Sequence, residues 1–514
     1  MSNFLLPVAS HWAGSAVASR FKAFADNTPL ATDDDTQPLY EIPDGTSEVK
    51  LTCTPTSPLY WETNVTLSVS SSGDISVSAN SAPLVRLRTA VADASRGTVV
   101  LVKVSRFKDV TSGPDGVAEL LKHPPGKRRK KINGAWVIQD VTASEVANHE
   151  NSYGAWPPPN WGLPPLPDVH YLDAQTPLDR DSGTLNFAKD PSLNLDVDNV
   201  VLRIAGGTVP ELFAVTWPKD PVIAPQENAA PTPFLVYFRQ TNKGNRYDED
   251  GLFVGGELGP YPMNFDYADT GMVESLHYGL APSAGSLNDP KAGPLFWAGA
   301  KGVPYQVAKA GAKIVTVMPC NKFGPEYGVL DDTEQTAKIL QEIQAFMFWR
   351  AGIADPPLSI GGTAFAAFSS ANYKLTDWLA NDKNLKGDFL LDTLKAVYFL
   401  DPPQRAVDGC IAAALKWADK ASDARIRLYS QYRMDSQGKL LGLKAGDKLP
   451  AAPFFESSPK RTATALPDVD PISTWSKTFA NLFGRPRNPA YVWADIHHII
   501  PATMLTHALA QGDI

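Results

Sequence analysis

The N-terminal part of the chain is a series of short stretches in which apolar and polar residues alternate. Polar turns separate these stretches, which is the pattern of strands that bury one face and expose the other. Several such strands at short spacing are typical of a sandwich or a barrel. We therefore predict a β-rich accessory domain over residues 1–154, with its clearest strands at 49–53, 64–69, 74–78 and 97–104.

A proline-rich segment follows this domain. Residues 155–167 read Ala-Trp-Pro-Pro-Pro-Asn-Trp-Gly-Leu-Pro-Pro-Leu-Pro. Proline lacks a backbone donor and has a nearly constant φ, so a helix or a central strand is excluded here. The segment is expected to be a stiff, extended connector.

The pattern changes after the connector, because apolar strand-like runs now alternate with amphipathic helical stretches. The helix expected at 333–351 carries Ile339, Leu340 and Ile343 on one face. Such alternation predicts a mostly parallel, doubly wound α/β sheet over residues 168–514, covered by helices on both faces. The expected strands are 199–204, 212–217, 234–238, 313–318, the run that ends before Ser369, 396–401, 425–429 and 490–493.

Ser369 stands where one of these strands stops and a helix begins. Ala367 and Ala371 lie two places before and after it. A serine on such a sharp strand-to-helix turn needs small neighbours at these positions, because the backbone there leaves no room for larger side chains. The pattern Ala-Phe-Ser-Ser-Ala, although glycine is usual at one or both places, predicts that Ser369 is a nucleophile.

A serine nucleophile needs a histidine to accept its proton and a carboxylate to orient that histidine. His497 and His498 follow the run 490–493, and we select His497 as the base, with His498 as the alternative. Asp435, beyond the strand at 425–429, is the favoured carboxylate. Asp401, at the end of the preceding strand, is the alternative.

The order of strand, serine, aspartate and histidine from about residue 198 onward resembles the α/β-hydrolase superfamily of serine esterases and lipases. The resemblance implies an oxyanion hole made by the backbone N–H of Ser370 and by one from the loop after the third strand, at Gln240 or Thr241. It also implies a carboxylic ester as substrate, a small molecule or a lipid, with no metal and no organic cofactor. Aromatic-rich insertions at 251–293 and 436–488 have the composition of lids over an apolar pocket.

The charge and cysteine content narrow the classes of partner. The formal net charge of -8 argues against a nucleic-acid partner, and three scattered cysteines fit neither a disulfide framework nor a zinc site. The basic run Lys127–Lys131 is expected either in a solvated loop or in peripheral contact with an anionic surface.

No stretch is apolar for long enough to span a membrane as a helix. The N-terminus lacks the features of a cleavable signal, so a cytoplasmic location or export without such a signal is expected.

These observations lead to one main hypothesis and two alternatives. The main hypothesis is a serine hydrolase that cleaves carboxylic esters through an acyl-enzyme. One alternative is a non-catalytic binding or structural protein on a hydrolase scaffold, because a fold does not determine a function. The other is a bacterial effector lipase whose N-terminal domain docks to a delivery partner. The oligomeric state does not follow from the sequence.

Overall fold

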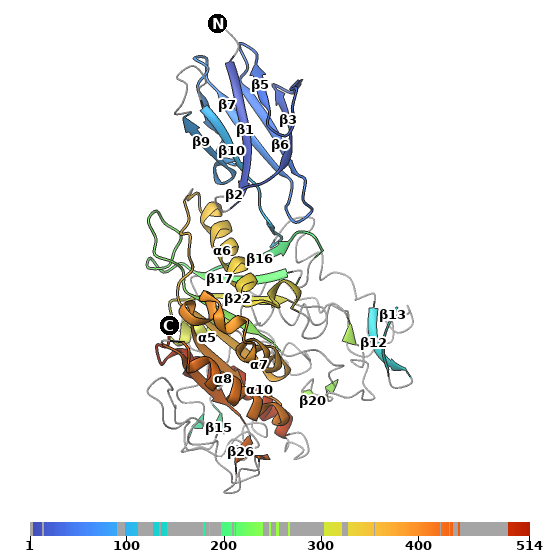
Figure 1. Ribbon diagram of the computed structural model, residues 1–514, viewed down its shortest axis with the longest axis vertical. Coiled ribbons are helices and arrows are strands. Elements are labelled where there is room, and N and C mark those ends of the chain that lie inside the picture. The colour runs from blue at the N-terminus through green and yellow to red at the C-terminus, as the bar shows by residue number, and fades with distance from the viewer. Residues whose placement is uncertain are drawn as a thin grey trace.

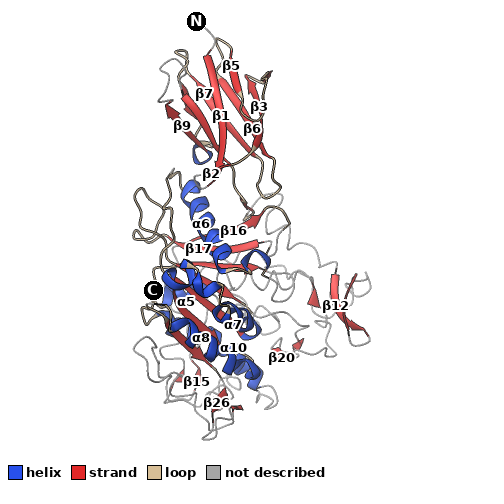
Figure 2. Cartoon of the chain, in the orientation of Figure 1, coloured by secondary structure: helices blue, strands red, loops and turns tan. Residues whose placement is uncertain are grey.

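The computed structural model describes residues 4–111 (except 13–14 and 90–97), 197–239 (except 208–209 and 211), 303–320, 327–430 (except 354 and 422) and 492–514. It also describes short strands between these ranges. The described chain forms an elongated molecule with an all-β unit at one end and a sheet flanked by helices at the other (Figure 1). Figure 2 shows that the long helices lie in this second unit, whereas the N-terminal unit holds a short helical turn, η1 (Ala82–Leu84).

The N-terminal unit consists of two sheets. Residues alternate between buried and exposed along its strands, as in β3, where Phe21, Ala23 and Ala25 are buried. The order in one sheet is β2 (Ser15–Ala16), β1 (Phe4–Trp12), β10 (Thr98–Lys103) and β9 (Val85–Thr89), with β5 (Leu39–Ile42) also paired to β1. The order in the other is β4 (Thr28–Leu30), β3 (Ser19–Ala25), β6 (Glu48–Pro55), β7 (Thr63–Val69) and β8 (Ile75–Val77).

The second unit is built on an eight-stranded mixed sheet. The strands β22, β18, β23, β24 and β25 run parallel to one another, whereas β17 is antiparallel to both β16 and β22. The order is β11 (Phe107–Asp109), β16 (Val197–Ile204), β17 (Leu212–Pro218), β22 (Val315–Cys320), β18 (Phe234–Phe238), β23 (Thr363–Phe368), β24 (Leu394–Leu400) and β25 (Arg425–Tyr429). Every residue of β22, β18 and β23 is buried, because both faces of these central strands are covered.

Helices cover the two faces of this sheet. Side chains of α6 (Thr333–Arg350), α7 (Asn372–Ala380) and α8 (Val407–Ala418) belong to the core cluster that contains Val397 and Phe399 of β24. The buried side chains of α5 (Val303–Lys309) and α10 (Val492–Leu509) lie outside that cluster, and these two helices contact each other. Successive strand residues point to opposite faces, so α5 and α10 form the second layer.

Shorter elements complete the described chain. The small sheets are formed by β12 (Lys127–Ile132), β13 (Ala135–Asp140) and β21 (Asp266–Tyr267), by β14 (Leu178–Asp179) and β15 (Thr184–Leu185), by β19 (Arg246–Tyr247) and β20 (Phe253–Gly255), and by β26 (Tyr432–Met434) and β27 (Leu440–Gly442). The short helical turns are η1 (Ala82–Leu84), η4 (Gly328–Leu330), η5 (Ser369–Ala371), η6 (Asn384–Lys386), η7 (Phe389–Thr393) and η8 (Gln404–Ala406).

The expected domain boundary at residue 154 needs correction. β11 lies within the predicted accessory domain, yet it hydrogen-bonds to β16 and closes one edge of the eight-stranded sheet. β12 likewise pairs with β21, a strand of the predicted catalytic part. Strand edges need partners for their backbone groups, and here the partners come from both sides of the predicted boundary. The sandwich therefore ends near Lys103, and the connector at 155–167 lies outside the described residues.

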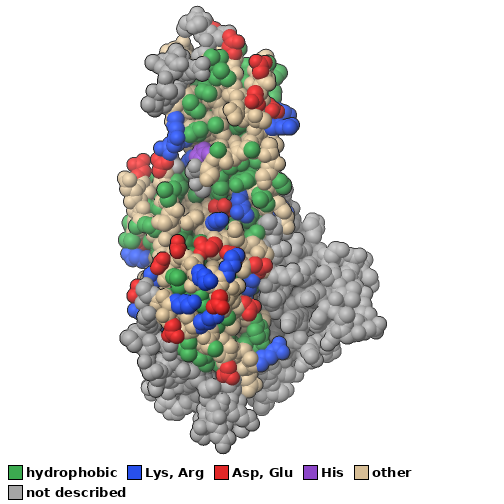
Figure 3. Space-filling model, viewed as in Figure 1, with side chains coloured by type: hydrophobic (Ala, Val, Ile, Leu, Met, Phe, Trp, Pro, Cys, Tyr) green, Lys and Arg blue, Asp and Glu red, His purple; other side chains and the backbone are tan. Residues whose placement is uncertain are grey.

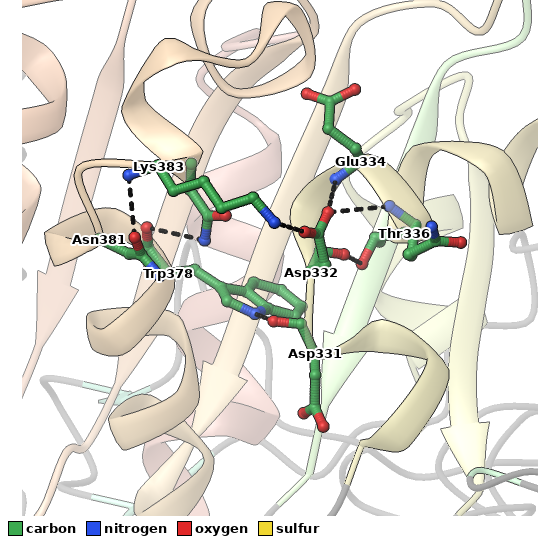
Figure 4. A network of polar contacts seen from close by, with 9 residues as sticks. Asp331, Asp332, Glu334, Thr336, Trp378, Asn381 and Lys383 are labelled. Carbon is green, nitrogen blue, oxygen red and sulfur yellow. Dashed lines mark hydrogen bonds and ion pairs between the residues drawn. The ribbon is translucent and has the colours of Figure 1, made fainter.

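A polar network fixes α7, the helix that follows Ser369, to the start of α6 (Figure 4). Asp332 caps α6 by accepting hydrogen bonds from the backbone N–H groups of Glu334 at 2.8 Å and Gln335 at 3.2 Å. The same carboxylate pairs with Lys383 Nζ at 3.2 Å. The Trp378 indole N–H on α7 donates to the carbonyl of Asp331 at 3.0 Å. The network thus joins two helices of one layer through backbone groups that would otherwise lack partners.

Charged side chains of both signs are interspersed over the helices in the middle of the view in Figure 3. Exposed ion pairs occur in this unit, for example between Lys416 of α8 and Asp382 at 2.9 Å. Exposed pairs of this kind contribute about 1 kcal/mol or less each. Packing of the apolar layers, rather than these pairs, therefore stabilises the helices against the sheet.

The two units are joined through the end of α6. Trp349 packs edge-on against Trp12 of β1, with ring centroids 5.0 Å apart, and Lys103 Nζ lies 4.6 Å from the centre of the Trp349 ring. Arg86 of β9 forms a bidentate ion pair with Asp355. Burial lowers the pKa of Lys103 to about 8, because the ammonium loses hydration at this junction. The sandwich is therefore held against α6 by aromatic and charged contacts.

We predict that His11, at the same junction, makes stability depend on pH. Burial, followed by the charges of Lys103, Arg88 and Arg86, lowers the pKa of His11 to about 4 from 6.5. Between these two values the unfolded chain binds a proton that the folded chain does not, so the free energy of unfolding rises as pH increases from 4 to 6.5.

The measurement is thermal unfolding of the wild type and His11→Gln at pH 4, 5, 6.5 and 7.5. The difference in Tm between the two proteins should change below pH 6.5 and stay constant above it, because neutral histidine and glutamine do not titrate there. An identical pH dependence in both proteins would contradict the assignment.

Candidate active site

The first component of the site is the turn after β23. Phe368 has an extended backbone with φ -108°, and the next residue, Ser369, has φ +55°. A left-handed φ is unfavourable for a residue with a side chain and persists only when the surrounding structure holds it. Ala367 and Ala371 are both fully buried beside the turn, whereas Ser369 is only partly buried. The backbone therefore places a hydroxyl at the carboxyl edge of the sheet, with small residues on either side.

The second component is Asp401, directly after β24. Its φ of +41° turns the chain out of the sheet one strand away from Ser369. Its backbone N–H donates to the carbonyl of Tyr429 in β25 at 2.7 Å, which holds the turn in place. The side chain is fully buried. A buried carboxylate requires a partner that donates hydrogen bonds or carries positive charge.

His497 provides that partner and links it to the serine. Its Nδ1 is in hydrogen-bond contact with Asp401 Oδ2, and its Nε2 lies 2.9 Å from Ser369 Oγ. The neutral tautomer consistent with both contacts donates from Nδ1 to the carboxylate and accepts at Nε2 from the hydroxyl. The Phe368 ring lies against the imidazole, with centroids 4.7 Å apart, and 16% of the His497 side chain is exposed.

His497 is carried by a helix, contrary to the expected strand at 490–493 that was to precede it. Residues 492 and 493 already belong to α10, which runs from Val492 to Leu509. The apolar residues of this segment continue at helical spacing beyond His497, and a helix buries them against α5 and β24. Pro501 lies inside the helix, and it cannot donate the usual hydrogen bond to the carbonyl of His497.

The remaining predicted site residues have different outcomes. Asp435, the favoured carboxylate, lies outside the described residues, and the carboxylate that contacts His497 is the alternative, Asp401. The side chain of His498 is also not described. Ser370 follows Ser369 in η5, so its backbone N–H, the predicted oxyanion donor, belongs to the first turn of a helical segment. Gln240 and Thr241 lie outside the described residues, so the second oxyanion donor stays a prediction.

Polar contacts that the sequence did not reveal fix the far end of α10. Asp513 pairs with Arg427 of β25 through two hydrogen bonds of 2.6 and 2.7 Å, and both side chains are almost fully buried. The Gln306 side chain of α5 accepts from the backbone N–H of Thr506 at 3.3 Å. No spacing in the sequence relates these residues, because Arg427 and Asp513 are far apart along the chain. Together they restrain the helix that carries His497.

Other candidate sites receive less support. Among the described residues, no group of His, Cys, Asp and Glu side chains could hold a metal ion. The cysteines are buried free thiols and form no disulfide: Cys53, Cys320 and Cys410. No described helix combines the length and apolar character that a membrane span requires. Lys127–Lys131 belong to strand β12 rather than to the expected loop, and contact with an anionic surface stays a prediction. Most of the two predicted lids, at 251–293 and 436–488, lies outside the described residues.

The geometry is suited to proton transfer from a hydroxyl. Ser369 Oγ can transfer its proton to His497 Nε2, and the Asp401 carboxylate can stabilise the imidazolium that results. All three groups come from loops or helices at the carboxyl edge of β23 and β24, where open α/β sheets bind their ligands.

Similarity of the chain to known proteins is confined to solved structures. No protein-family profile and no curated protein matches the chain. Among solved structures, the chain is similar to the pilus adhesin RrgA from Streptococcus pneumoniae with 11% sequence identity and a TM-score of 0.14. The match covers 55% of this chain and 26% of the adhesin, so the chain spans about a quarter of that protein. Such a low TM-score carries no information about fold or function.

Proposed function

We propose that the chain is a serine hydrolase that cleaves carboxylic esters, built on a sheet of the α/β-hydrolase type. The observation that carries the proposal is the continuous contact from Ser369 Oγ through His497 to Asp401. The positive φ of Ser369 at the end of a central parallel strand supports it, because a strained turn at this position is the mark of a nucleophile elbow. The antiparallel β17 in an otherwise mostly parallel sheet agrees with the proposed fold.

The proposed reaction begins with attack of Ser369 Oγ on the ester carbonyl carbon. His497 Nε2 takes the hydroxyl proton as the new C–O bond forms, and the carbonyl oxygen becomes an oxyanion. A backbone donor at Ser370 would stabilise this oxyanion by about 3 kcal/mol. Collapse of the intermediate breaks the bond to the leaving alkoxide, which takes the proton from His497. Water, deprotonated by His497, then releases the carboxylic acid from the acyl-enzyme and restores the serine.

A fluorophosphonate probe tests the proposal directly, because it reacts with serines that an adjacent base has activated. We expect one labelled peptide containing Ser369, together with hydrolysis of p-nitrophenyl esters. Prior heat denaturation should abolish the labelling. Absence of both labelling and hydrolysis in the folded protein would favour the alternative, a binding or structural protein on this scaffold.

A series of p-nitrophenyl esters of increasing acyl length distinguishes an esterase from a lipase. A lipase-like enzyme, as the aromatic composition of the two insertions predicts, should have a higher kcat/KM for long acyl chains than for acetate. The opposite order would assign the site to short-chain esters.

A further inference from the structure

The side chain of Asn372 connects the two strained turns of the candidate site. Asn372 is the first residue of α7 and is fully buried. Its amide nitrogen lies 2.8 Å from the carbonyl oxygen of Ser369 and 3.2 Å from the carbonyl oxygen of Leu400. One side chain therefore donates to the backbone of the serine turn and to the backbone that immediately precedes Asp401.

The sheet explains why an extra donor is needed there. β23 and β24 are paired up to Phe368 and Leu400. At Ser369 the chain turns away into η5, so the neighbouring strand has no further backbone N–H in line with the Leu400 carbonyl. The Asn372 amide occupies that position. Its two N–H groups can serve one carbonyl each, whereas serine, aspartate or leucine at the same place could not serve both.

The two carbonyls that Asn372 holds belong to unfavourable backbone segments. Ser369 has φ +55° and Asp401, which follows Leu400, has φ +41°. Non-glycine residues in this region cost about 1–3 kcal/mol each and persist only where neighbouring groups hold them. The other side of the Asp401 turn is held by the bond from its N–H to Tyr429. Asn372 thus holds the backbone of the Asp401 turn on the side that faces Ser369.

The arrangement also has a cost that argues for a specific role. In the described part of the chain, the buried oxygen Oδ1 of Asn372 has no hydrogen-bond partner. An unsatisfied buried acceptor is destabilising by about 1–3 kcal/mol. An amide with only one of its two polar atoms satisfied is a poor choice for packing alone, so its donor groups are the property that the site uses.

We propose that Asn372 is a positioning residue that sets the distance between Ser369 and Asp401. This inference rests on the proposed hydrolase function. The imidazole of His497 is rigid and must contact both residues at once, so the serine and the aspartate have to be held at one separation. Asn372 touches neither the substrate nor the imidazole in this mechanism, and acts only through the backbone of the two turns.

The test compares kcat and KM of the wild type, Asn372→Leu and Asn372→Ser on a soluble p-nitrophenyl ester. Leucine has a similar size without donors, whereas the serine hydroxyl can donate to the Ser369 carbonyl only. We expect kcat to fall by about 10²-fold for leucine, as a displacement near 1 Å would produce, and by a smaller factor for serine. KM should change less than about twofold, because substrate contacts are unaltered.

Asn384 provides a matched control. It is also buried, and its side-chain amide donates to the carbonyl of Trp378 at 3.3 Å, away from the two turns. Asn384→Leu should lower Tm as Asn372→Leu does, yet keep kcat within about twofold of the wild type.

The outcomes separate this inference from the proposed function. If the wild type neither hydrolyses esters nor reacts with the probe, the proposed function is wrong. If the wild type is active and both Asn372 variants keep the kcat of Asn384→Leu, the positioning role is wrong. If Asn372→Leu does not fold, Asn372→Ser decides, because serine is polar, is smaller than asparagine and keeps one donor for the Ser369 carbonyl. A parallel rise in KM and fall in kcat would indicate general damage and also contradict the proposal.

Discussion

Replacement of Ser369 by alanine is expected to lower kcat/KM for ester hydrolysis by about 10⁴-fold or more, and to abolish probe labelling. Without the hydroxyl no acyl-enzyme can form, and only the remaining polar groups of the site could assist water. Ser369→Gly should be equally inactive but more stable than Ser369→Ala by about 1 kcal/mol, because glycine adopts φ +55° without strain. Steady-state kinetics and thermal unfolding of the two variants measure both effects.

The neighbouring serine is the control for this experiment. Ser370→Ala removes a hydroxyl one residue away and preserves the backbone N–H that the proposed oxyanion hole uses, so much of the activity should remain. Full activity in Ser369→Ala, or labelling of a different serine, would overturn the assignment of the nucleophile.

Asp401→Asn is expected to lower kcat by about 10³–10⁴-fold with little change in KM. An asparagine amide can donate to Nδ1 of His497, which favours the tautomer that carries its proton on Nε2. That nitrogen then faces Ser369 as a donor and cannot accept the hydroxyl proton. The carboxylate is fully buried, so no solvent group can replace it at this position. Steady-state kinetics with a p-nitrophenyl ester measure the effect.

Asp435→Asn decides between the two aspartates that the sequence offered. We expect it to retain wild-type kcat, since Asp401 is the carboxylate in contact with His497. His497→Ala should be inactive, and His498→Ala should retain activity. An inactive Asp435 variant beside an active Asp401 variant would mean that the orienting carboxylate is not the one in contact with His497.

The order of elements around Ser369 was accessible from the sequence because it depends on local patterns. The apolar run of β23, the small residues Ala367 and Ala371 and the amphipathic α7 are all adjacent in the chain. The mostly apolar character of β22 and the continuous apolar run of β18 likewise predicted strands covered on both faces. In such segments the burial pattern and the backbone conformation are set by the same few neighbouring residues.

Two predictions about elements were wrong because contacts with residues far along the chain determine these elements. Tyr-Val-Trp at 491–493 has the composition of a strand, but the buried face of α10 against α5 outweighs that short-range preference. The boundary at 154 followed the proline-rich composition of 155–167, whereas β11 and β12 pair with strands far along the chain. A C-terminal fragment cut at the connector would lack β11, an edge strand of the eight-stranded sheet.

The sequence by itself determined which residue types could form the site and in what order, because turns and helix starts depend on residues that are adjacent in the chain. It left open which aspartate and which histidine meet Ser369. Only the tertiary structure decided that His497 contacts Asp401, and it added the contact of Asn372 with Ser369 and Leu400. The pairing of β23 with β24 and the docking of α10 determine these contacts. They join residues that are distant along the chain, so no local pattern could specify them.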